Sequence, residues 1–523
     1  MSEAPVVSIK NFSFTYANTH EPILRDLNLE VHAGELILLA GRSGCGKSTL
    51  LRCLNGIIPH LLSGTVDGGI MIKGHDSMAM QPETIARYAG SVFQNPRSQF
   101  FHTNVLDEIA FGVESSGLPQ ETIVRRVDAA LELFGISHLV DRNMYELSSG
   151  EQQKVAFASI HATGPDIFLL DEPSANLDLH AINNLKKLLL VLKNQGKTII
   201  IAEHRLHYLF DIADKLVIMQ YGSFERILTN GQSVDDEQRL AYGLRTANLR
   251  AFASACDAKR RPPGAAERGG NLHAQEVCYA YKRNKAQALS KFSTIFHEGE
   301  RVAIIGRNGA GKTTLIKLIA GLLPPSNGVF RDVGGKRLSC AQRLKNSGIV
   351  LQECGQQLFY PTVLEELASA AARPGGNKGG RRPADSLKAL GLEELTDQHP
   401  QNLSAGQQQR LAFAIAAMNT PRILILDEPT SGLDAQSMMA MGAAINKQAA
   451  QGTTIIIVTH DIEFIYEFCD RAVVMGKGFV ESTLDRRDFT SFFCDKIDDD
   501  PWILPPESGG NDFLIVPNWG PGE

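Results

Sequence analysis

Two glycine-rich segments of this sequence have the residues and the spacing needed to bind a phosphate group. Both fit G-x-x-x-x-G-K-[ST], and both lie between a short apolar run and a run that favours a helix. Glycines let successive backbone N–H groups converge on one anion, while the lysine reaches the outer phosphates and the hydroxyl binds Mg²⁺. The segments are Gly41-Arg42-Ser43-Gly44-Cys45-Gly46-Lys47-Ser48 with Thr49, and Gly306-Arg307-Asn308-Gly309-Ala310-Gly311-Lys312-Thr313 with Thr314.

Carboxylates and a histidine follow each glycine-rich segment. Asp171-Glu172 and Asp427-Glu428 each end an apolar run that we expect to be a buried strand. The aspartate is placed to hold Mg²⁺ through water, and the glutamate to take a proton from an attacking water. His204 and His460 come 33 residues after the aspartates. A lone histidine is usually a satisfied core residue, but this recurrence favours hydrogen bonds to a γ-phosphate and to the attacking water.

A third pattern also occurs twice. Leu147-Ser148-Ser149-Gly150-Glu151 matches Leu403-Ser404-Ala405-Gly406-Gln407, and each is followed by two glutamines, a basic residue and a helical run. A serine and small residues that open a helix can bind an anion, although they can also form a simple helix cap. Because each copy already has a phosphate loop, a second anion site suggests a nucleotide shared between the copies.

The elements that position these residues form one unit that occurs twice. Lys47 and Lys312 lie 265 residues apart, whereas Asp171 and Asp427 lie 256 apart. In each copy, short Ile/Leu/Val runs alternate with amphipathic stretches, which predicts an α/β fold with a mostly parallel sheet covered on both faces. The stretches 95–146 and 353–402 look mainly helical, so we expect an inserted helical subdomain in each copy. The expected parts are domain 1 at 5–232, a linker at 233–270, domain 2 at 271–485 and a C-terminal tail at 486–523.

The segments outside the two domains are expected to be simpler. The linker is Gly- and Pro-broken with a basic cluster at 259–264, and is expected to be flexible; contact with an anionic lipid surface is the minority alternative. Residues 373–383 are expected to form a surface loop. The tail is acidic and Pro-rich, holds Trp502 and Trp519, and is expected to pack on the second domain or to contact a partner.

Composition limits the classes of protein that fit. The chain has 523 residues, 43% apolar content and a net charge of −6, which is ordinary for a globular protein and argues against a broad nucleic-acid surface. No apolar stretch approaches the roughly 20 residues of a membrane span, and Met1–Lys10 lacks a signal pattern, so a cytosolic chain is expected. The eight cysteines form no C-x-x-C pair, which favours reduced thiols over disulfides or metal sites.

In their order and spacing, these blocks resemble the nucleotide-binding domains of ABC proteins, over nearly the whole chain. The resemblance implies two P-loop NTPase (ABC-type) domains in tandem that dock head to tail and enclose two ATP molecules with Mg²⁺. It identifies 147–151 and 403–407 as the two signature segments of the family. It implies that Lys47 and Glu172 face Ser404 and Gly406, and that Lys312 and Glu428 face Ser148 and Gly150. The implied remaining contacts are adenine stacking on Tyr16 and Tyr281, nucleotide and metal contacts of Gln94 and Gln352, metal contacts of Ser48, Thr313, Asp171 and Asp427, and nucleotide contacts of Lys312, Ser148 and Gly150.

The departures from the family pattern lie in the signature segments. The usual third-position glycine is Ser149 in one half and Ala405 in the other, and the usual closing glutamine is Glu151 in the first half. Both halves keep the lysine, aspartate, glutamate and histidine, so two competent ATPase sites are expected. Glu151 adds negative charge near an anionic nucleotide, which predicts a slower site where it takes part.

Within ABC proteins, the sequence resembles the ATPases of energy-coupling-factor importers, which take up vitamins and transition-metal ions. The segments that carry this resemblance are 94–101, 103–112 and 202–206, and similar segments occur in the second half at 352–359 and 362–367. This resemblance implies a peripheral protein on the cytoplasmic face of the membrane, with an integral-membrane transport subunit and a substrate-binding membrane subunit as partners. The transported substrate is chosen by such a partner and is not encoded in this chain.

Two alternatives remain open at this point. The first is the ATPase of another class of ABC importer or exporter. The second is a soluble, non-transport ABC protein that acts on ribosomes or DNA. Proteins of the second kind usually carry a long charged helical linker, zinc cysteines or long coiled coils, and the Gly/Pro-broken linker and dispersed cysteines do not match.

Overall fold

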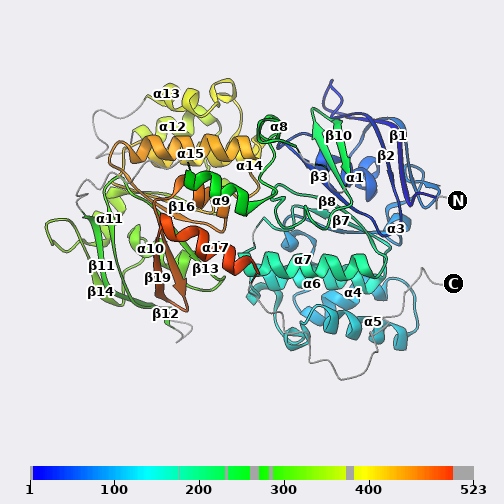
Figure 1. Ribbon diagram of the computed structural model, residues 1–523, viewed down its shortest axis with the longest axis horizontal. Coiled ribbons are helices and arrows are strands. Elements are labelled where there is room, and N and C mark those ends of the chain that lie inside the picture. The colour runs from blue at the N-terminus through cyan, green and yellow to red at the C-terminus, as the bar shows by residue number, and fades with distance from the viewer. Residues whose placement is uncertain are drawn as a thin grey trace. The chain divides into compact units, whose positions relative to one another are not determined.

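The computed structural model describes residues 4–175, 177–229, 232, 234–258, 270–281, 287–372 and 382–498. These residues form two compact units that divide between Ala247 and Asn248, and each unit has an α/β architecture (Figure 1). The predicted fold class, two P-loop domains in tandem with helical insertions, is confirmed. Among the described residues, no helix is both long enough and apolar enough to cross a bilayer.

The first unit is built on a six-stranded sheet in which only the edge strand β10 is antiparallel to its neighbour. Both faces of this sheet are buried. Along β3, Leu36 and Leu38 enter one hydrophobic core while Ile37 and Leu39 enter another. In spatial order the strands are β10 (Ser223–Thr229), β9 (Lys215–Gln220), β3 (Leu36–Gly41), β8 (Thr198–Ala202), β7 (Ile167–Asp171) and β6 (Ala89–Val92).

A second, antiparallel sheet covers one face of the first unit, and the sequence analysis did not foresee it. Its strands β2 (Leu24–Val31), β1 (Val7–Tyr16), β4 (Gly64–Ile72) and β5 (His75–Asp76) lie in that order. Phe12 and Phe14 of β1 are fully buried in the core that also contains Leu50 of the first helix. This sheet therefore holds the helix that follows the phosphate loop from the side.

Helices cover the rest of the first unit. The predicted helical subdomain is present, and its apolar residues Val105, Ile109 and Ala130 share one core with Leu38 of the sheet. The helices are α1 (Lys47–Leu54), α2 (Ile57–His60), α3 (Pro82–Ile85), α4 (Val105–Glu114), α5 (Gln120–Leu133), α6 (Ser149–Thr163), α7 (Leu179–Asn194) and α8 (Asp236–Ala241).

The second unit repeats this plan with a mixed six-stranded sheet and a three-stranded antiparallel sheet. The six strands are β15 (Ser347–Val350), β16 (Ile423–Asp427), β17 (Thr454–Val458), β13 (Arg301–Gly306), β18 (Arg471–Gly476) and β19 (Phe479–Asp485). The three are β12 (Gln287–His297), β11 (Gly270–Ala280) and β14 (Asn327–Arg331). The helices are α10 (Lys312–Ile319), α11 (Cys340–Asn346), α12 (Val363–Ala371), α13 (Pro383–Ala389), α14 (Ala405–Ala417), α15 (Ala435–Ala449), α16 (Ile462–Phe468), α9 (Leu249–Ala258) and α17 (Phe489–Asp498).

Parts of the expected linker and tail are helical. Helices α8 and α9 fall within residues 233–270, and α9 packs against α16 and α17. In the tail, Phe489 and Phe493 are buried and pack around Tyr466 of α16. The basic cluster at 259–264, most of the loop at 373–383, and both tryptophans lie outside the described residues.

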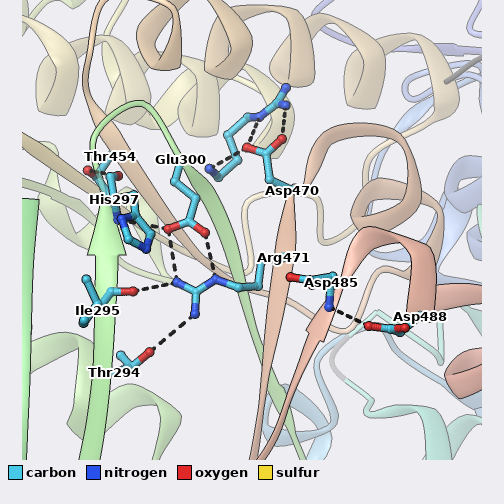
Figure 2. A network of polar contacts seen from close by, with 10 residues as sticks. Thr294, Ile295, His297, Glu300, Thr454, Asp470, Arg471, Asp485 and Asp488 are labelled. Carbon is cyan, nitrogen blue, oxygen red and sulfur yellow. Dashed lines mark hydrogen bonds and ion pairs between the residues drawn. The ribbon is translucent and has the colours of Figure 1, made fainter. Parts of the chain in front are cut away.

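A polar network fixes the end of β13 that lies opposite the phosphate loop. Arg471 donates from Nε to Glu300 Oε1 at 2.7 Å and from Nη2 to Glu300 Oε2 at 3.1 Å and to the Ile295 carbonyl at 2.7 Å (Figure 2). These bonds join β18 to the β12–β13 turn. In the first unit, Lys215 takes the place of the arginine and donates to Glu35 Oε2 at 2.8 Å. The network therefore braces the strands that carry the phosphate loops.

Candidate functional site

The first phosphate loop connects the end of β3 to the start of α1. Gly41 has a φ of 151°, and a Cβ placed there would lie 2.2 Å from the Met219 carbonyl oxygen, so only glycine fits. The side chain of Lys47 is buried, and its Nζ donates to the carbonyls of Gly41 and Arg42, both at 3.1 Å. The ammonium is therefore held at the mouth of the loop, where the helix N-terminus adds positive potential.

Ser48 and Asp171 meet at the edge of the same loop. Ser48 Oγ donates to Asp171 Oδ1 at 2.9 Å. Burial, followed by the charge of Glu172, raises the pKa of Asp171 above its ordinary value. A hydroxyl and a buried carboxylate are oxygen donors of the kind that Mg²⁺ binds together with water and phosphate oxygens. The residues present fit an Mg²⁺ ion.

Glu172 lies at the centre of a group of three side chains. Gln94 Nε2 donates to its Oε2 at 2.8 Å, and His204 Nε2 lies 3.3 Å from its Oε1. The backbone of Glu172 has a left-handed φ of 45°, and its N–H donates to the Ala202 carbonyl at 2.8 Å. For a residue other than glycine this conformation costs about 1 kcal/mol or more, so surrounding contacts must hold it.

The second unit brings the equivalent residues together. Lys312 Nζ donates to the carbonyls of Gly306 and Arg307 at 2.6 and 3.0 Å. Glu428 again has a left-handed φ, of 50°, and its Oε1 lies 3.6 Å from His460 Nε2.

The three candidate metal ligands of this unit, Asp427, Thr313 and Gln352, differ in burial. Burial raises the pKa of Asp427 to about 6, and the lysine charges nearby only partly oppose that rise. Thr313 and Gln352 are both exposed to solvent.

The signature serines cap the helices that follow them. Ser148 is the N-cap of α6, and its backbone N–H and Oγ both donate to Glu151 Oε2, at 2.8 and 2.7 Å. Ser404 is the N-cap of α14, and its backbone N–H donates to Gln407 Oε1 at 2.8 Å. Both segments therefore form a capping box, with Gly150 and Gly406 in the first turn of the helix.

The tyrosines predicted to stack on adenine lie beside the helices that follow the phosphate loops. Tyr16 Oη is 3.3 Å from Thr49 Oγ1, and Tyr281 Oη is 3.2 Å from Thr314 Oγ1. Each ring also packs edge-on against the aromatic residue two positions earlier, Phe14 or Tyr279.

The structure adds residues that the sequence analysis did not single out. Glu203, only 2% exposed, accepts hydrogen bonds from the backbone N–H groups of His204 and Arg205 at 2.8 and 3.1 Å and from Tyr208 Oη at 2.9 Å. Gln153 and Gln409 are buried and donate to the turns that contain Glu172 and Glu428. The recurrence of the glutamines at the 256-residue spacing was a usable signal, whereas Glu203 has no counterpart because Thr459 occupies its position.

Comparison with known families identifies the family of this chain. The family model described as ABC transporter matches residues 24–175 and 289–431, which together make up more than half of the chain. The chain belongs to the ABC transporter family. Its two units are ABC ATPase domains in tandem, and ATP hydrolysis with Mg²⁺ is the activity that this family implies.

Full-length relatives of this ABC protein share its tandem organisation. A Treponema denticola protein provisionally named an ABC transporter ATP-binding protein is 41% identical over 92% of this chain and 97% of its own length. A Streptomyces coelicolor protein of the same provisional description is 34% identical over 91% of this chain and 93% of its own. The solved structure described as a model of ribosome-bound archaeal Pelota and ABCE1 matches 93% of this chain and 80% of that chain, with a TM-score of 0.64. At 21% identity it shows the fold alone.

Proposed function

We propose that this ABC protein hydrolyses ATP at two sites and thereby drives uptake of a vitamin or a metal ion through a separate membrane subunit. The observation that carries the proposal is the recurrence of one geometry in both units: a buried lysine in the phosphate loop, and a glutamate within 3.6 Å of a histidine at the ends of adjacent strands. The names of the relatives support the transport role.

The residues of each site have distinct roles in this proposal. Lys47 binds the outer phosphates, and the N–H groups of the loop complete the cradle. Ser48 and Asp171 hold Mg²⁺, which when bound neutralises phosphate charge. Glu172 takes the proton of the attacking water, while His204 and Gln94 orient that water and the γ-phosphate. In the second unit these roles belong to Lys312, Thr313, Asp427, Glu428, His460 and Gln352.

Each site is completed by the signature segment of the other half. The N-cap serine and the first turn of α6 or α14 form a helix N-terminus, whose partial positive charge suits an anionic γ-phosphate. ATP would close the two halves on each other, and hydrolysis would let them reopen. Fusion in one chain raises the effective concentration of each half for the other.

An exposed aromatic residue in each unit supports a membrane partner. Phe101 is 76% exposed and Phe359 is 81% exposed, and each follows the recurring glutamine of its half, Gln94 or Gln352, by seven residues. Large apolar side chains left in water at the same place in both halves suit contact with another protein. Together with the resemblance to energy-coupling-factor importers, this favours an integral-membrane transport subunit and a substrate-binding membrane subunit as partners, and a peripheral position at the cytoplasmic face of the membrane.

The test separates ATP hydrolysis from transport. The double variant Glu172→Gln, Glu428→Gln should abolish turnover while ATP binding persists, because amides cannot take a proton from water. ATP turnover close to that of the unmodified chain would contradict this mechanism.

Partner capture then tests the transport role and the importer class. Detergent extracts should yield membrane subunits bound to the chain, and Phe101→Ser with Phe359→Ser should weaken that capture. Recovery of the chain with ribosomes, or with subunits of another transporter class, would replace the proposed role.

A further inference from the structure

A pair of buried glutamines links each signature helix to the turn that carries the catalytic glutamate. Gln153 lies in α6 and Gln409 in α14, each five residues after the signature serine. We propose that Gln153 and Gln409 are positioning residues that hold the catalytic glutamate in its active backbone conformation and make that conformation depend on the signature helix. The inference rests on the two-site ATPase proposed above and adds a physical connection between the sites.

The second unit shows the contact most directly. Gln409 is 5% exposed, and its Nε2 donates to the carbonyl oxygen of Glu428 at 2.9 Å. The N–H of the same glutamate donates to the Val458 carbonyl at 2.8 Å. The left-handed residue is therefore held at both of its peptide groups, once by the sheet and once by α14. Removing either bond frees a conformation that a residue other than glycine rarely adopts.

The first unit repeats the contact one residue further along. Gln153 is 6% exposed and donates from Nε2 to the carbonyl oxygen of Pro173, the residue after Glu172. The Glu172 N–H is again bound by the neighbouring strand, at Ala202. A buried amide that contacts the same turn in both halves points to a role of that turn rather than to incidental satisfaction of a polar group.

The position of each glutamine along its helix connects the two proposed sites. Each glutamine lies about one and a half turns from the capping serine, on the same continuous helix. In the proposed sandwich, the serine end of α14 contacts the nucleotide of one site, while Gln409 holds the glutamate of the other. A shift of the helix on nucleotide contact would then reach the second catalytic glutamate through one hydrogen bond.

The neighbouring glutamines provide matched controls. Gln408 donates to the Pro400 carbonyl at 3.1 Å and Gln152 to the Met144 carbonyl at 2.9 Å, and both acceptors lie in the helical subdomain. A Gln→Met change at any of the four positions removes a donor and keeps similar length. Only the changes at 153 and 409 free a catalytic turn.

The experiment uses the purified full chain and measures ATP affinity, kcat and the Hill coefficient for ATP. Gln409→Met and Gln153→Met should each lower kcat by about 10- to 100-fold, because misplaced catalytic groups cost rates of this order. ATP affinity and the melting temperature should stay within twofold and a few degrees of the parent, and the Hill coefficient should fall towards 1. Gln408→Met should leave all of these values close to the parent.

Two outcomes overturn the inference. If the folded Gln409→Met and Gln153→Met chains keep the kcat of the parent, the glutamines have no positioning role. If kcat falls but the Hill coefficient does not change, the glutamines do not link the two sites. If a methionine variant fails to fold, Gln→Glu at the same position keeps the size and places an acceptor against the carbonyl, so it must give the same loss of kcat. An unmodified chain without ATPase activity would instead contradict the proposed function.

Discussion

The two halves hold their histidine in different ways. In the first half, the backbone N–H of His204 donates to Glu203 at 2.8 Å. His204 is therefore positioned by a residue that has no part in the proposed reaction. In the second half, Thr459 replaces that glutamate, and the N–H of His460 donates at 3.3 Å to Glu428 itself, the residue proposed as the general base. The same strand ends therefore support the same pair of side chains through two different polar arrangements.

This difference shows where each half is vulnerable. The first half concentrates its support on one buried carboxylate, which also binds Tyr208 and the backbone of Ser174. In the second half, two residues share this role. Thr459 Oγ1 accepts a hydrogen bond from the Asp461 N–H, and Asp461 caps α16. A single substitution should therefore do more harm in the first half.

Glu203→Ala is the change with the largest expected effect. It leaves the donors of Ser174, His204, Arg205 and Tyr208 buried without this acceptor, and such losses cost about 3–5 kcal/mol. Urea unfolding should show a destabilised transition of the first unit together with lower ATPase activity.

Thr459→Val in the second unit is the matched control. It removes one hydroxyl bond and should cost about 1 kcal/mol. Equal costs for the two variants would show that the halves do not differ in the way described.

The sequence predicted the parts of the fold with strong periodicity. Continuous apolar runs such as Ile423–Leu426 marked the buried parallel strands correctly. The antiparallel sheets were missed because β-bulges interrupt the alternation of their strands. Asn11 and Asp26 in the first unit have left-handed φ values near such register shifts, so inward and outward positions exchange along each strand.

The grouping of residues in the candidate site was predictable where residues repeat and carry chemistry of their own. Lys47, Asp171 and His204 met both conditions. Gln153 repeats but resembles an ordinary polar position on a helix, and Glu203 does not repeat at all. Their roles depend on which carbonyl or N–H group the fold brings beside them, and that information is three-dimensional.

A buried histidine gives the first half an acid sensitivity that the second half lacks at the equivalent position, where Ala417 stands. Burial, and then the charge of Lys197, lowers the pKa of His161 to about 4 from an ordinary 6.5. Above pH 6.5 the folded and unfolded states are both neutral there. As the pH falls below 6.5 the unfolded chain takes up a proton that the folded chain refuses, so stability is lost, by about 3 kcal/mol at pH 4.

His161→Leu should remove this loss. Unfolding of the variant and the parent, measured at pH 7 and again at pH 5, should show a stability difference that shifts in favour of the variant by about 2 kcal/mol at the lower pH. His138→Leu, at an exposed position of the same unit, should show no such shift. If the stability difference between the His161→Leu variant and the parent is the same at both pH values, the acid sensitivity comes from other groups.

The bracing network at the far end of the sheets offers a smaller contrast. Arg471 makes a two-pronged bond to Glu300 and a further bond to the Ile295 carbonyl (Figure 2). Lys215 keeps the carbonyl bond, to Glu30, but it cannot reproduce the two-pronged bond with Glu35. Arg471→Lys should therefore destabilise the second unit by about 1–2 kcal/mol. Lys215→Arg should change the first unit by less than about 0.5 kcal/mol, since nothing there is lost. Calorimetry of the two variants measures both values, and a larger cost at Lys215 reverses the comparison.

The smallest expected difference between the two halves comes from their signature segments. It affects the rate of ATP hydrolysis rather than the stability of either unit. Burial opposes the charge of Glu151, but its hydrogen bonds from Ser148 outweigh this and hold its pKa below the ordinary value, so it is ionised at neutral pH. Gln407 places a neutral oxygen in the same capping geometry. In the proposed sandwich, a negative charge several ångströms from the γ-phosphate would disfavour the closed state by about 1 kcal/mol, or roughly fivefold in rate.

The exchange of these two residues tests that contrast in both directions. Single-turnover hydrolysis in a Glu172→Gln background isolates the site that Ser148 completes, and Glu151→Gln should speed it about fivefold. In a Glu428→Gln background, Gln407→Glu should slow the other site by a similar factor. Because the capping box survives either exchange, the helices keep their start and only the charge changes. Unchanged rates in both backgrounds would mean that the signature carboxylate does not face the nucleotide, and the difference between the two sites would then have to come from Glu203.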